Sequence, residues 1–297
     1  MKFLVTGGAG FIGAHLVRRL QSDAPVNVLD NLATGHRDRL VGLDCHFYEG
    51  SILDRKLLFE AMRDVTHVFH LAAMVSVAES VANPTDCKQI NVEGTRRVLE
   101  AAAQAGAKRC VLASSCAIYG NDPAMPKIES LPPAPASPYA ISKLAGERIC
   151  TESIVPAVAL RFFNVYGPHQ DPNGPYAAAI PRFFQSALAG TPISIHGDGQ
   201  QTRDFVFIED VTAALIHVAL HPDLGGVYNV ASGQSTSILQ LANKILSLTR
   251  SSSPMTHTSS READVRFSSA SIERLRATGW SPKTTLDSGL ALLLPKT

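Results

Sequence analysis

Residues 137–147, "SPYAISKLAGE", place a phenol and an ammonium one helical turn apart. Ser137 is a favoured helix N-cap and Pro138 suits the first helical position, so Tyr139 and Lys143 are expected on one face of a single helix. A phenol has a pKa of about 10, but a neighbouring ammonium favours the phenolate and lowers that pKa. The pair is therefore a candidate base for taking a proton from a substrate hydroxyl. The spacing alone arises easily by chance, so the assignment depends on the surrounding motifs.

A serine hydroxyl gives this pair a third member. Ser115 ends the apolar run "RCVLASS" (109–115), which predicts a strand, and parallel sheets bind their ligands at the carboxyl ends of such strands. Its hydroxyl can hydrogen-bond the substrate oxygen that Tyr139 deprotonates. Ser114 is an alternative for this role, and a purely structural serine is another. We predict Ser115, Tyr139 and Lys143 as the catalytic residues.

A glycine-rich loop follows the first predicted strand. The stretch "TGGAGFIG" (6–13) lies between an apolar run and a helical one. Its glycines let the backbone turn tightly and approach a pyrophosphate, which then faces the positive N-terminus of the helix. A plain strand–helix turn is the alternative. The glycines with this G-x-x-G-x-x-G spacing are Gly7, Gly10 and Gly13.

An acidic residue sharpens this interpretation. Asp30 ends the second predicted strand, about 20 residues after the loop, where a carboxylate can bond the ribose hydroxyls of a dinucleotide. The same carboxylate repels a 2′-phosphate, so NAD is favoured over NADP. Arg37 and Arg39 lie close enough in sequence to leave NADP open. We predict NAD as the cofactor.

The pattern of strands and helices indicates the fold class. Short β-type runs alternate with helical segments through the first half, which predicts an α/β fold with a Rossmann-type doubly wound parallel sheet. The expected strands are 2–6, 26–30, 45–50, 66–73, 109–115 and 156–164, and the expected helices are 11–20, 87–105 and one beginning at Pro138.

The pattern loosens after residue 164, which predicts a smaller α/β substrate-binding C-terminal domain. We expect a NAD-binding domain over 1–163, to which 205–232 returns, and a nucleotide-sugar-binding domain over 164–204 and 233–297. The polar stretch 250–260, "RSSSPMTHTSS", is expected to be a surface connection.

Composition excludes several classes of function. The 297 residues are 45% hydrophobic and 18% charged with a formal net charge of +1, which gives no global attraction to nucleic acid or an anionic membrane. No window approaches the roughly 20 apolar residues of a membrane span, and the first residues lack the apolar run of a secretory signal. Five cysteines without C-x-x-C spacing and ten histidines without an H-E-x-x-H pattern predict reduced thiols and no metal site. We expect a cytoplasmic protein with neither a nucleic-acid nor a membrane partner.

A series of motifs runs in order along nearly the whole chain: "TGGAGFIG", "DNLATGH", "HLAA", "SSCAIYG", "YAISK", "RFFNVYG", "GDGQQTRDFVFIEDV" and "GWSPKTTLDSGL". The series resembles the extended short-chain dehydrogenase/reductase family of nucleotide-sugar enzymes, and within it the UDP-hexose 4-epimerases. The resemblance implies a tightly bound NAD in the N-terminal domain and a nucleoside-diphosphate sugar in the smaller domain. It also implies a homodimer, formed through helices near 87–105 and 138–153.

The resemblance carries the cofactor site over to individual positions. It assigns NAD contacts to the glycine loop, the ends of the following strands and the catalytic helix. One departure is Ser51, where many members have an aspartate that contacts the adenine. The assigned residues are Gly7, Gly10, Phe11, Ile12, Gly13, Asp30, Asn31, Thr34, Gly35, Ser51, Ile52, Leu71, Ala72, Ala73, Asn91, Ser114, Tyr139, Lys143 and Phe162.

The same resemblance assigns the substrate site. Arg203, Arg261 and Asn164 match residues that contact the diphosphate, and Ser194 and His196 fall where the family holds the uracil base. A solvated surface charge is the alternative for each arginine, and an ordinary loop histidine for His196. The full set of expected substrate contacts is Ser76, Ser115, Tyr139, Asn164, Ala179, Ile180, Phe183, Ser194, His196, Arg203, Arg261, Asp264 and Ser268.

Two features narrow the reaction. Dehydratases and decarboxylases of the family carry an acid within two positions of the catalytic hydroxyl, whereas here Cys116 and Ala117 follow Ser115, so simple 4-epimerisation is favoured. The resemblance also places Ser268 at a position where, in the 4-epimerases, a small residue admits an N-acetyl group; a surface serine is the alternative. We predict interconversion of UDP-N-acetylglucosamine and UDP-N-acetylgalactosamine through a 4-keto intermediate. A UDP-glucose/UDP-galactose 4-epimerase or a dual-specificity enzyme is the alternative, and a non-catalytic dinucleotide-binding protein is a remote one.

Overall fold

The computed structural model describes residues 1–173, 178–259 and 266–295. The chain divides into two compact units. Unit 1 comprises 1–120, 131–162 and 211–229, and unit 2 comprises 121–130, 163–210 and 230–297. None of the described helices is both long and apolar enough to cross a membrane.

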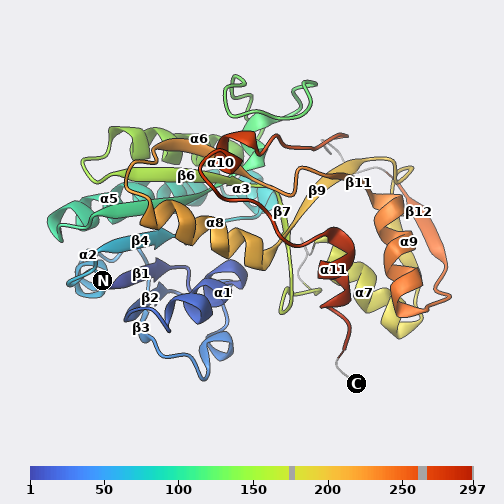
Figure 1. Cartoon of the computed structure of the whole chain (residues 1–297), viewed down its shortest axis with the longest axis horizontal. Helices are drawn as coiled ribbons and strands as arrows, with labels where there is room; N and C mark the ends of the chain where they lie inside the picture. The colour runs from blue at the N-terminus through green and yellow to red at the C-terminus, as the bar shows by residue number, and fades with distance from the viewer. Residues whose placement is uncertain (174–177, 260–265, 296–297) are drawn as a thin grey trace. The chain divides into compact units, whose positions relative to one another are not determined.

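Unit 1 is built on a seven-stranded sheet of order β10-β6-β5-β4-β1-β2-β3, and its neighbours from β6 to β3 all pair in parallel (Figure 1). The chain runs outward in one direction from β1 and in the other from β4, so a crevice is expected where the carboxyl ends of these two strands diverge. The predicted doubly wound sheet is confirmed. Its strands are β1 (Phe3–Thr6), β2 (Val26–Asp30), β3 (His46–Glu49), β4 (His67–His70), β5 (Arg109–Ser115), β6 (Ala157–Phe162) and β10 (Gly226–Val230).

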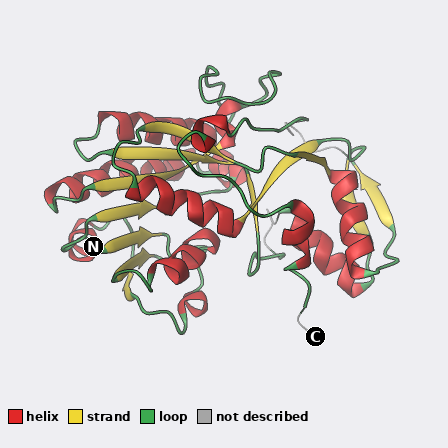
Figure 2. Ribbon diagram, viewed as in Figure 1, coloured by secondary structure: helices red, strands yellow, loops and turns green. Residues whose placement is uncertain are grey.

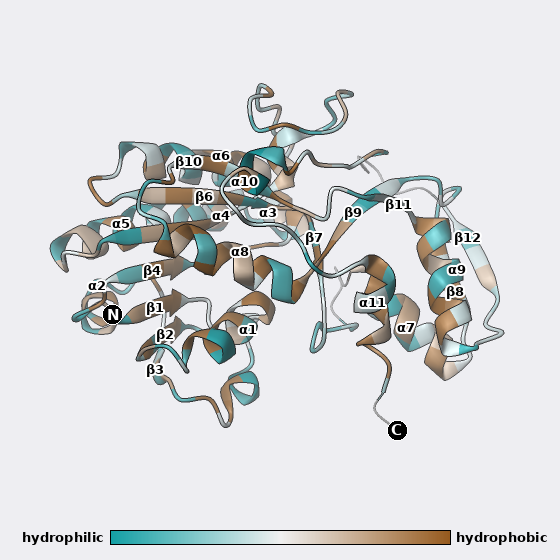
Figure 3. Ribbon diagram, in the orientation of Figure 1, coloured by the Kyte–Doolittle hydropathy of each residue, from teal (hydrophilic) through white to brown (hydrophobic). Residues whose placement is uncertain are grey.

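Helices cover both faces of this sheet (Figure 2). Figure 1 shows α1 and α8 in front of the sheet, whereas α2, α5 and α6 lie behind it, where α5 contacts both α2 and α6. The central strands are largely apolar, while the helices carry both apolar and polar residues (Figure 3), as expected for a sheet buried on both faces. The helices of this unit are α1 (Phe11–Leu20), α2 (Arg55–Ala61), α3 (Val77–Ala82), α4 (Pro84–Lys88), α5 (Gly94–Gln104), α6 (Pro138–Glu152) and most of α8 (Ile208–Leu220).

The helix predicted over 87–105 is confirmed, and it contains a π-helical turn. A π-helical turn over Gln89–Glu93 separates α4 from α5. Within it the Asn91 amide bonds both backbone groups of Met74, at 2.8 and 2.9 Å, and the Thr95 hydroxyl donates to the Asn91 carbonyl oxygen. A hydroxyl that takes a helix carbonyl weakens the regular backbone ladder. The predicted helix therefore runs without a break through this turn, from residue 84 to 104, and only its hydrogen-bonding pattern changes there.

The described part of unit 2 contains two small sheets. The first has the order β11-β9-β7, and the second pairs β12 with β8. Helices α7 and α9 contact each other, and α11 contacts α9 and β9. The strands are β7 (Asn164–Tyr166), β8 (Ile193–His196), β9 (Thr202–Phe207), β11 (Ser235–Ser237) and β12 (Met255–Thr258), and the helices are α7 (Ala179–Ala189), α9 (Ile238–Thr249), α10 (Glu273–Arg276) and α11 (Leu286–Ala291).

Two expectations about this region need correction. The polar stretch 250–260 is not only a surface connection, because Met255–Thr258 pairs in parallel with β8. Residues 121–130 belong to unit 2, although the predicted boundary placed them in the N-terminal domain. The cause is a short bridge in which the Lys127 N–H donates to the Ser269 carbonyl and the Ser271 N–H donates to the Lys127 carbonyl, at 2.8 and 2.9 Å.

Candidate active site

The helix that carries the expected base begins as its sequence predicts. The Ser137 hydroxyl accepts a hydrogen bond from the Ala140 N–H at 3.1 Å, and Pro138 occupies the first helical turn. The Tyr139 N–H lies in the first turn of α6, where no carbonyl of the helix itself can accept it. It donates instead to Ser80 Oγ on α3 at 3.1 Å. The cap and this tertiary bond fix both the start of α6 and the position of the tyrosine.

The three predicted catalytic side chains come together in unit 1. Ser115 ends β5, where its hydroxyl accepts from the Ala117 N–H at 3.1 Å and hydrogen-bonds the phenol of Tyr139. Lys143 Nζ lies 5.7 Å from the centroid of the Tyr139 ring and donates to the Ala113 carbonyl oxygen at 2.9 Å. A hydroxyl, a phenol and an ammonium therefore share the carboxyl end of β5.

The electrostatics of this group correct one expectation. Burial raises the pKa of Tyr139 to about 12, against the lowering effect of its hydrogen bond with Ser115. Burial lowers the pKa of Lys143 to about 8, against the raising effects of Cys87 and Glu147. Lys143 does not bring the phenol's pKa toward neutrality: desolvation of the phenol is the largest effect on this pKa, and the ammonium donates to the Ala113 carbonyl. A phenolate here needs a further positive charge.

Ser114 is not a rival to Ser115. Its side chain is buried, and its hydroxyl donates to Glu147 Oε1 at 2.6 Å. Successive side chains of a strand point to opposite faces, so the two serines cannot serve the same site.

The glycine loop forms the close turn that a dinucleotide requires. Gly7 has a φ of +73°, and a Cβ there would lie 2.7 Å from the Ala72 nitrogen after β4. A Cβ at Gly13 would lie 2.2 Å from the Gly7 carbonyl oxygen. The Gly10 N–H donates to that same carbonyl, at 3.1 Å. The loop therefore packs the start of α1 closely against the sheet where the carboxyl ends of β1 and β4 diverge, and its backbone geometry fits a pyrophosphate.

Asp30 anchors the loop from the end of β2. One carboxylate oxygen accepts from the Ala9 N–H at 2.9 Å and the other from the Leu32 N–H at 2.8 Å. A carboxylate has about four lone-pair sites, so acceptor capacity remains for ribose hydroxyls. Arg37 pairs with Glu49 at 3.1 Å. The remaining acceptor capacity of Asp30 and the pairing of Arg37 with Glu49 therefore fit NAD.

The Gly13→Ala variant should lose NAD affinity roughly 100-fold, because its Cβ would meet the rigid Gly7 backbone and force the loop to open. Titration of the cofactor-stripped protein with NAD measures this. Gly225→Ala is the matched control, since nothing lies within 4 Å of its Cβ position. Wild-type NAD affinity in Gly13→Ala would show that the loop does not bind the pyrophosphate.

The other predicted cofactor residues divide into two groups. Those next to the crevice lie in the first turn of α1 or in the segments after β2, β3 and β4: Phe11, Ile12, Asn31, Thr34, Gly35, Ser51, Leu71, Ala72 and Ala73. The second group has side chains already engaged in packing or hydrogen bonds within unit 1. These are Ile52, buried against α5, Asn91, which also donates to Ser142 Oγ at 2.9 Å, Ser114, and Phe162, buried at the end of β6.

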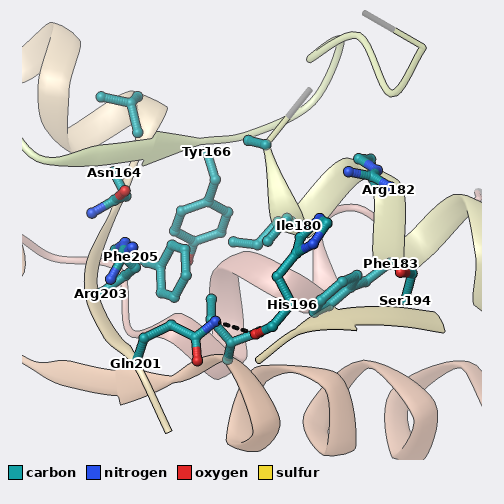
Figure 4. Close-up of a pocket in the computed structure, with 14 residues that line it drawn as sticks. Asn164, Tyr166, Ile180, Arg182, Phe183, Ser194, His196, Gln201, Arg203 and Phe205 are labelled. Atoms are coloured by element: carbon teal, nitrogen blue, oxygen red, sulfur yellow. Dashed lines mark hydrogen bonds between the residues drawn. The ribbon is translucent and has the colours of Figure 1, made fainter. Parts of the chain in front are cut away.

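Unit 2 holds a cavity of about 240 Å³ (Figure 4). Many of the expected substrate residues line it together: Asn164, Ala179, Ile180, Phe183, Ser194, His196 and Arg203. Other lining residues were missed: Val165, Tyr166, Ala178, Arg182, Gln201, Phe205 and Ile238. Some of these stand beside predicted residues in the motifs "RFFNVYG" and "GQQTRDF", which was the available signal. Among the described residues that line it, Arg182 and Arg203 carry cationic side chains, so the cavity can take an anion.

Strand pairing positions the polar residues of this cavity. Asn164 on β7 is in register with Phe205 on the adjacent strand β9, and its side chain donates to the Asp204 carbonyl at 3.2 Å. Asp204 itself is fully buried, and its carboxylate accepts from the backbone of Ser232, Gly233 and Ala270. Since Arg203 precedes Asp204, these bonds fix the backbone position of the arginine.

Ser76, a further predicted substrate contact, is not among the described residues that line this cavity. The Ser76 hydroxyl caps α3 by accepting from the Glu79 N–H at 3.0 Å. Ser268 is buried, and its N–H donates to Thr202 Oγ1 at 3.4 Å. It is not among the described residues that line the cavity. Arg261 and Asp264 lie outside the described residues.

Comparison with known proteins places these features in a family. The chain is 38% identical to the UDP-glucose 4-epimerase of Mycolicibacterium smegmatis over 98% of this chain and 96% of that one. The UDP-N-acetylglucosamine 4-epimerase of Methanobrevibacter ruminantium M1, solved with UDP-N-acetylmuramic acid, superposes with a TM-score of 0.93 at 36% identity, covering 98% and 96% of the two chains. The UDP-glucose 4-epimerase of Thermus thermophilus, solved with NAD, gives a TM-score of 0.91 at 36% identity, covering 98% and 97%.

The family model for the NAD dependent epimerase/dehydratase family matches residues 3–231. That span includes the glycine loop, Asp30 and the Ser115–Tyr139–Lys143 group. The match agrees with the resemblance found in the motifs, and the loop geometry fits the cofactor in the family's description. The chain therefore belongs to the NAD dependent epimerase/dehydratase family and uses NAD as its cofactor.

Proposed function

We propose that this chain is a NAD-dependent 4-epimerase that interconverts UDP-N-acetylglucosamine and UDP-N-acetylgalactosamine through a 4-keto intermediate. The observation that carries the proposal is the meeting of Ser115, Tyr139 and Lys143 at the end of β5. No carboxylate stands at either of the two positions after Ser115. Elimination or decarboxylation would need such a second acid, whereas epimerisation at one carbon needs only one base.

The residues divide the work of proton transfer. Tyr139 takes the proton of the sugar's 4-hydroxyl and returns it to the same oxygen after the sugar has turned over. Ser115 hydrogen-bonds that oxygen and so orients it toward the phenol. Lys143 stabilises the phenolate by its charge. Bound NAD supplies the two-electron oxidation and reduction at C4, and its oxidised ring carries the further positive charge that the phenolate needs.

The cavity of unit 2 suits the nucleoside diphosphate. Arg203 and Asn164 can donate to diphosphate oxygens, as their motifs imply, and Arg182 adds a second cation on the cavity wall. Ser194 and His196, on β8, are available to the base. Anchoring at the diphosphate leaves the sugar free to turn, which epimerisation requires.

The identity of the sugar rests on Ser268 and on the similarity to the Methanobrevibacter enzyme, whose name gives UDP-N-acetylglucosamine. The similarity to the Mycolicibacterium enzyme favours UDP-glucose and UDP-galactose as the second candidate pair. The homodimer expected from the resemblance stays a prediction.

An assay with each UDP-hexose separates the candidates. We expect the purified protein to turn over the acetylated pair, and absence of this turnover would contradict the proposed substrate. In Ser268→Tyr, the bulky ring should lower kcat/KM for UDP-N-acetylglucosamine by about tenfold or more relative to UDP-glucose. Ser268→Ala is the matched control and should keep the wild-type ratio. An unchanged ratio in Ser268→Tyr would remove this residue from the specificity argument.

A further inference from the structure

A buried polar network lies beside the catalytic groups of unit 1. Arg161 on β6 binds both carboxylate oxygens of Glu147 on α6, at 2.9 and 2.8 Å, and the two side chains are only 4% and 5% exposed. Ser114 donates to the same carboxylate at 2.6 Å. The guanidinium lies 4.8 Å from the centre of the Tyr119 ring, whose hydroxyl donates to Asn229 on β10 at 2.7 Å. The network therefore ties α6 to three strands of the sheet.

The network is adjacent in sequence to the reacting groups. Glu147 lies one helical turn beyond Lys143, and Ser114 directly precedes Ser115. Lys143 donates to the carbonyl of Ala113, while Glu147 accepts from the side chain of Ser114. Two successive turns of α6 thus bind two successive residues of β5. A slide of the helix that separated the phenol from the serine would break both bonds.

We propose that Glu147 is a positioning residue of the reaction: through Ser114 it holds Ser115 in register with the catalytic helix, and its negative charge stabilises the ammonium of Lys143. The inference rests on the proposed function only for the catalytic roles of Ser115, Tyr139 and Lys143. The contacts of Glu147 with β5 and β6 stand on the structure.

The charges around Lys143 support the electrostatic half of this role. The groups that interact electrostatically with Lys143 are His70 from β4, Cys87 from α4, and Tyr139 and Glu147 from α6 itself. Burial and the charge of Lys143 lower the pKa of His70 to about 3, so this imidazole is neutral. Burial lowers the pKa of Lys143, and Cys87 and Glu147 oppose that effect. Among these four groups, Glu147 is the carboxylate.

A purely structural ion pair is the alternative, and loss of stability alone cannot separate the two. Glu147→Gln would leave Arg161 buried without its counter-charge, which is strongly destabilising. A charge-neutral double variant, E147Q/R161M, removes both charges and keeps comparable volume. Ser114→Ala keeps the ion pair and removes only the bond to β5. Glu152→Gln removes an exposed carboxylate from the same helix and is the matched control.

The pH profile of kcat tests the charge. With Glu147→Gln, the alkaline limb that reports deprotonation of Lys143 should move to lower pH by about one unit or more. The shift should be smaller in E147Q/R161M, because the uncompensated guanidinium is gone. Glu152→Gln should keep the wild-type profile. An unmoved limb in Glu147→Gln would overturn the electrostatic role.

Ser114→Ala tests the geometry. We expect kcat to fall roughly tenfold with KM and the alkaline limb unchanged, because the serine of the catalytic group would be misaligned while all charges remain. Wild-type kcat in Ser114→Ala would overturn the positioning role.

A measurement without substrate keeps this inference separate from the proposed function. NMR titration of the NAD-bound protein with ¹³Cε-labelled lysine, assigned with Lys143→Met, gives the pKa of Lys143 directly. A lower pKa in Glu147→Gln than in wild type supports the inference even if no UDP-hexose is turned over, a result that would count against the proposed reaction. Equal pKa values in the two proteins would contradict it whatever the substrate.

Discussion

Tyr139→Phe should lower kcat for 4-epimerisation by about 10³-fold while the protein stays folded and NAD-bound. The substitution removes one hydroxyl and keeps the ring, so the packing of α6 against β5 is preserved. That hydroxyl bonds Ser115 and is the proposed base. Because burial raises the pKa of Tyr139 to about 12, its deprotonation depends on the charges placed around it, and no water-exposed group can substitute easily.

The measurement is kcat with each UDP-hexose, accompanied by NAD content and melting temperature for the same preparation. Tyr48→Phe, on β3 away from the catalytic helix, is the control and should keep wild-type activity. If Tyr139→Phe kept more than about a tenth of wild-type kcat, another group would have to be the base.

The parts of the site that follow from local patterns were predictable. A Ser-Pro pair before Tyr139 specifies a capped helix start, and the structure has that cap. The glycines of the first loop and Asp30 at the end of β2 are brought together by parallel pairing of β1 and β2, which the alternating pattern implied. These features depend on backbone geometry close in sequence, and sequence reports such geometry well.

Other features depend on contacts far apart in the chain. The pKa of Tyr139 is raised because several elements bury the phenol. The spacing of Tyr139 and Lys143 carries no information about this burial, and it suggested a lowered pKa instead. The use of Ser114 by Glu147 could not be foreseen, because nothing in the sequence near 147 indicates which strand that carboxylate meets. Pairing of Met255–Thr258 with β8 likewise arises from tertiary packing, since its side chains are mostly polar and all exposed.

Lys143→Met should make the protein inactive and, at neutral pH, more stable. The folded-state pKa of Lys143 is about 8 against an ordinary value of 10.5, which corresponds to a cost of roughly 3 kcal/mol for burying the ammonium. Methionine has a similar length and no charge, so it removes this cost. It also leaves the Ala113 carbonyl without its donor, which costs about 1 kcal/mol. The expected net gain at pH 7 is about 2 kcal/mol.

The pH dependence gives the sign of the effect. Below pH 8 the lysine is protonated in both states, and the folded protein bears the full cost. Between about 8 and 10.5 the unfolded state binds more protons, so wild-type stability rises with pH relative to the variant. The advantage of Lys143→Met should therefore shrink over this range and vanish near its upper end. Paired urea titrations at several pH values measure it, with Ile141→Met, an exposed site on the same helix, as control.

If Lys143→Met were less stable than wild type at pH 7, or if the two proteins were equally stable at every pH, the ammonium would carry no burial cost. The expected result has a physical meaning beyond the one residue. Catalysis needs a cation held out of water beside a phenol, and the fold gives up stability to keep it there. Glu147 and the Ala113 carbonyl reduce that cost without removing it, which leaves Lys143 with a pKa close enough to neutral for its charge to depend on its neighbours.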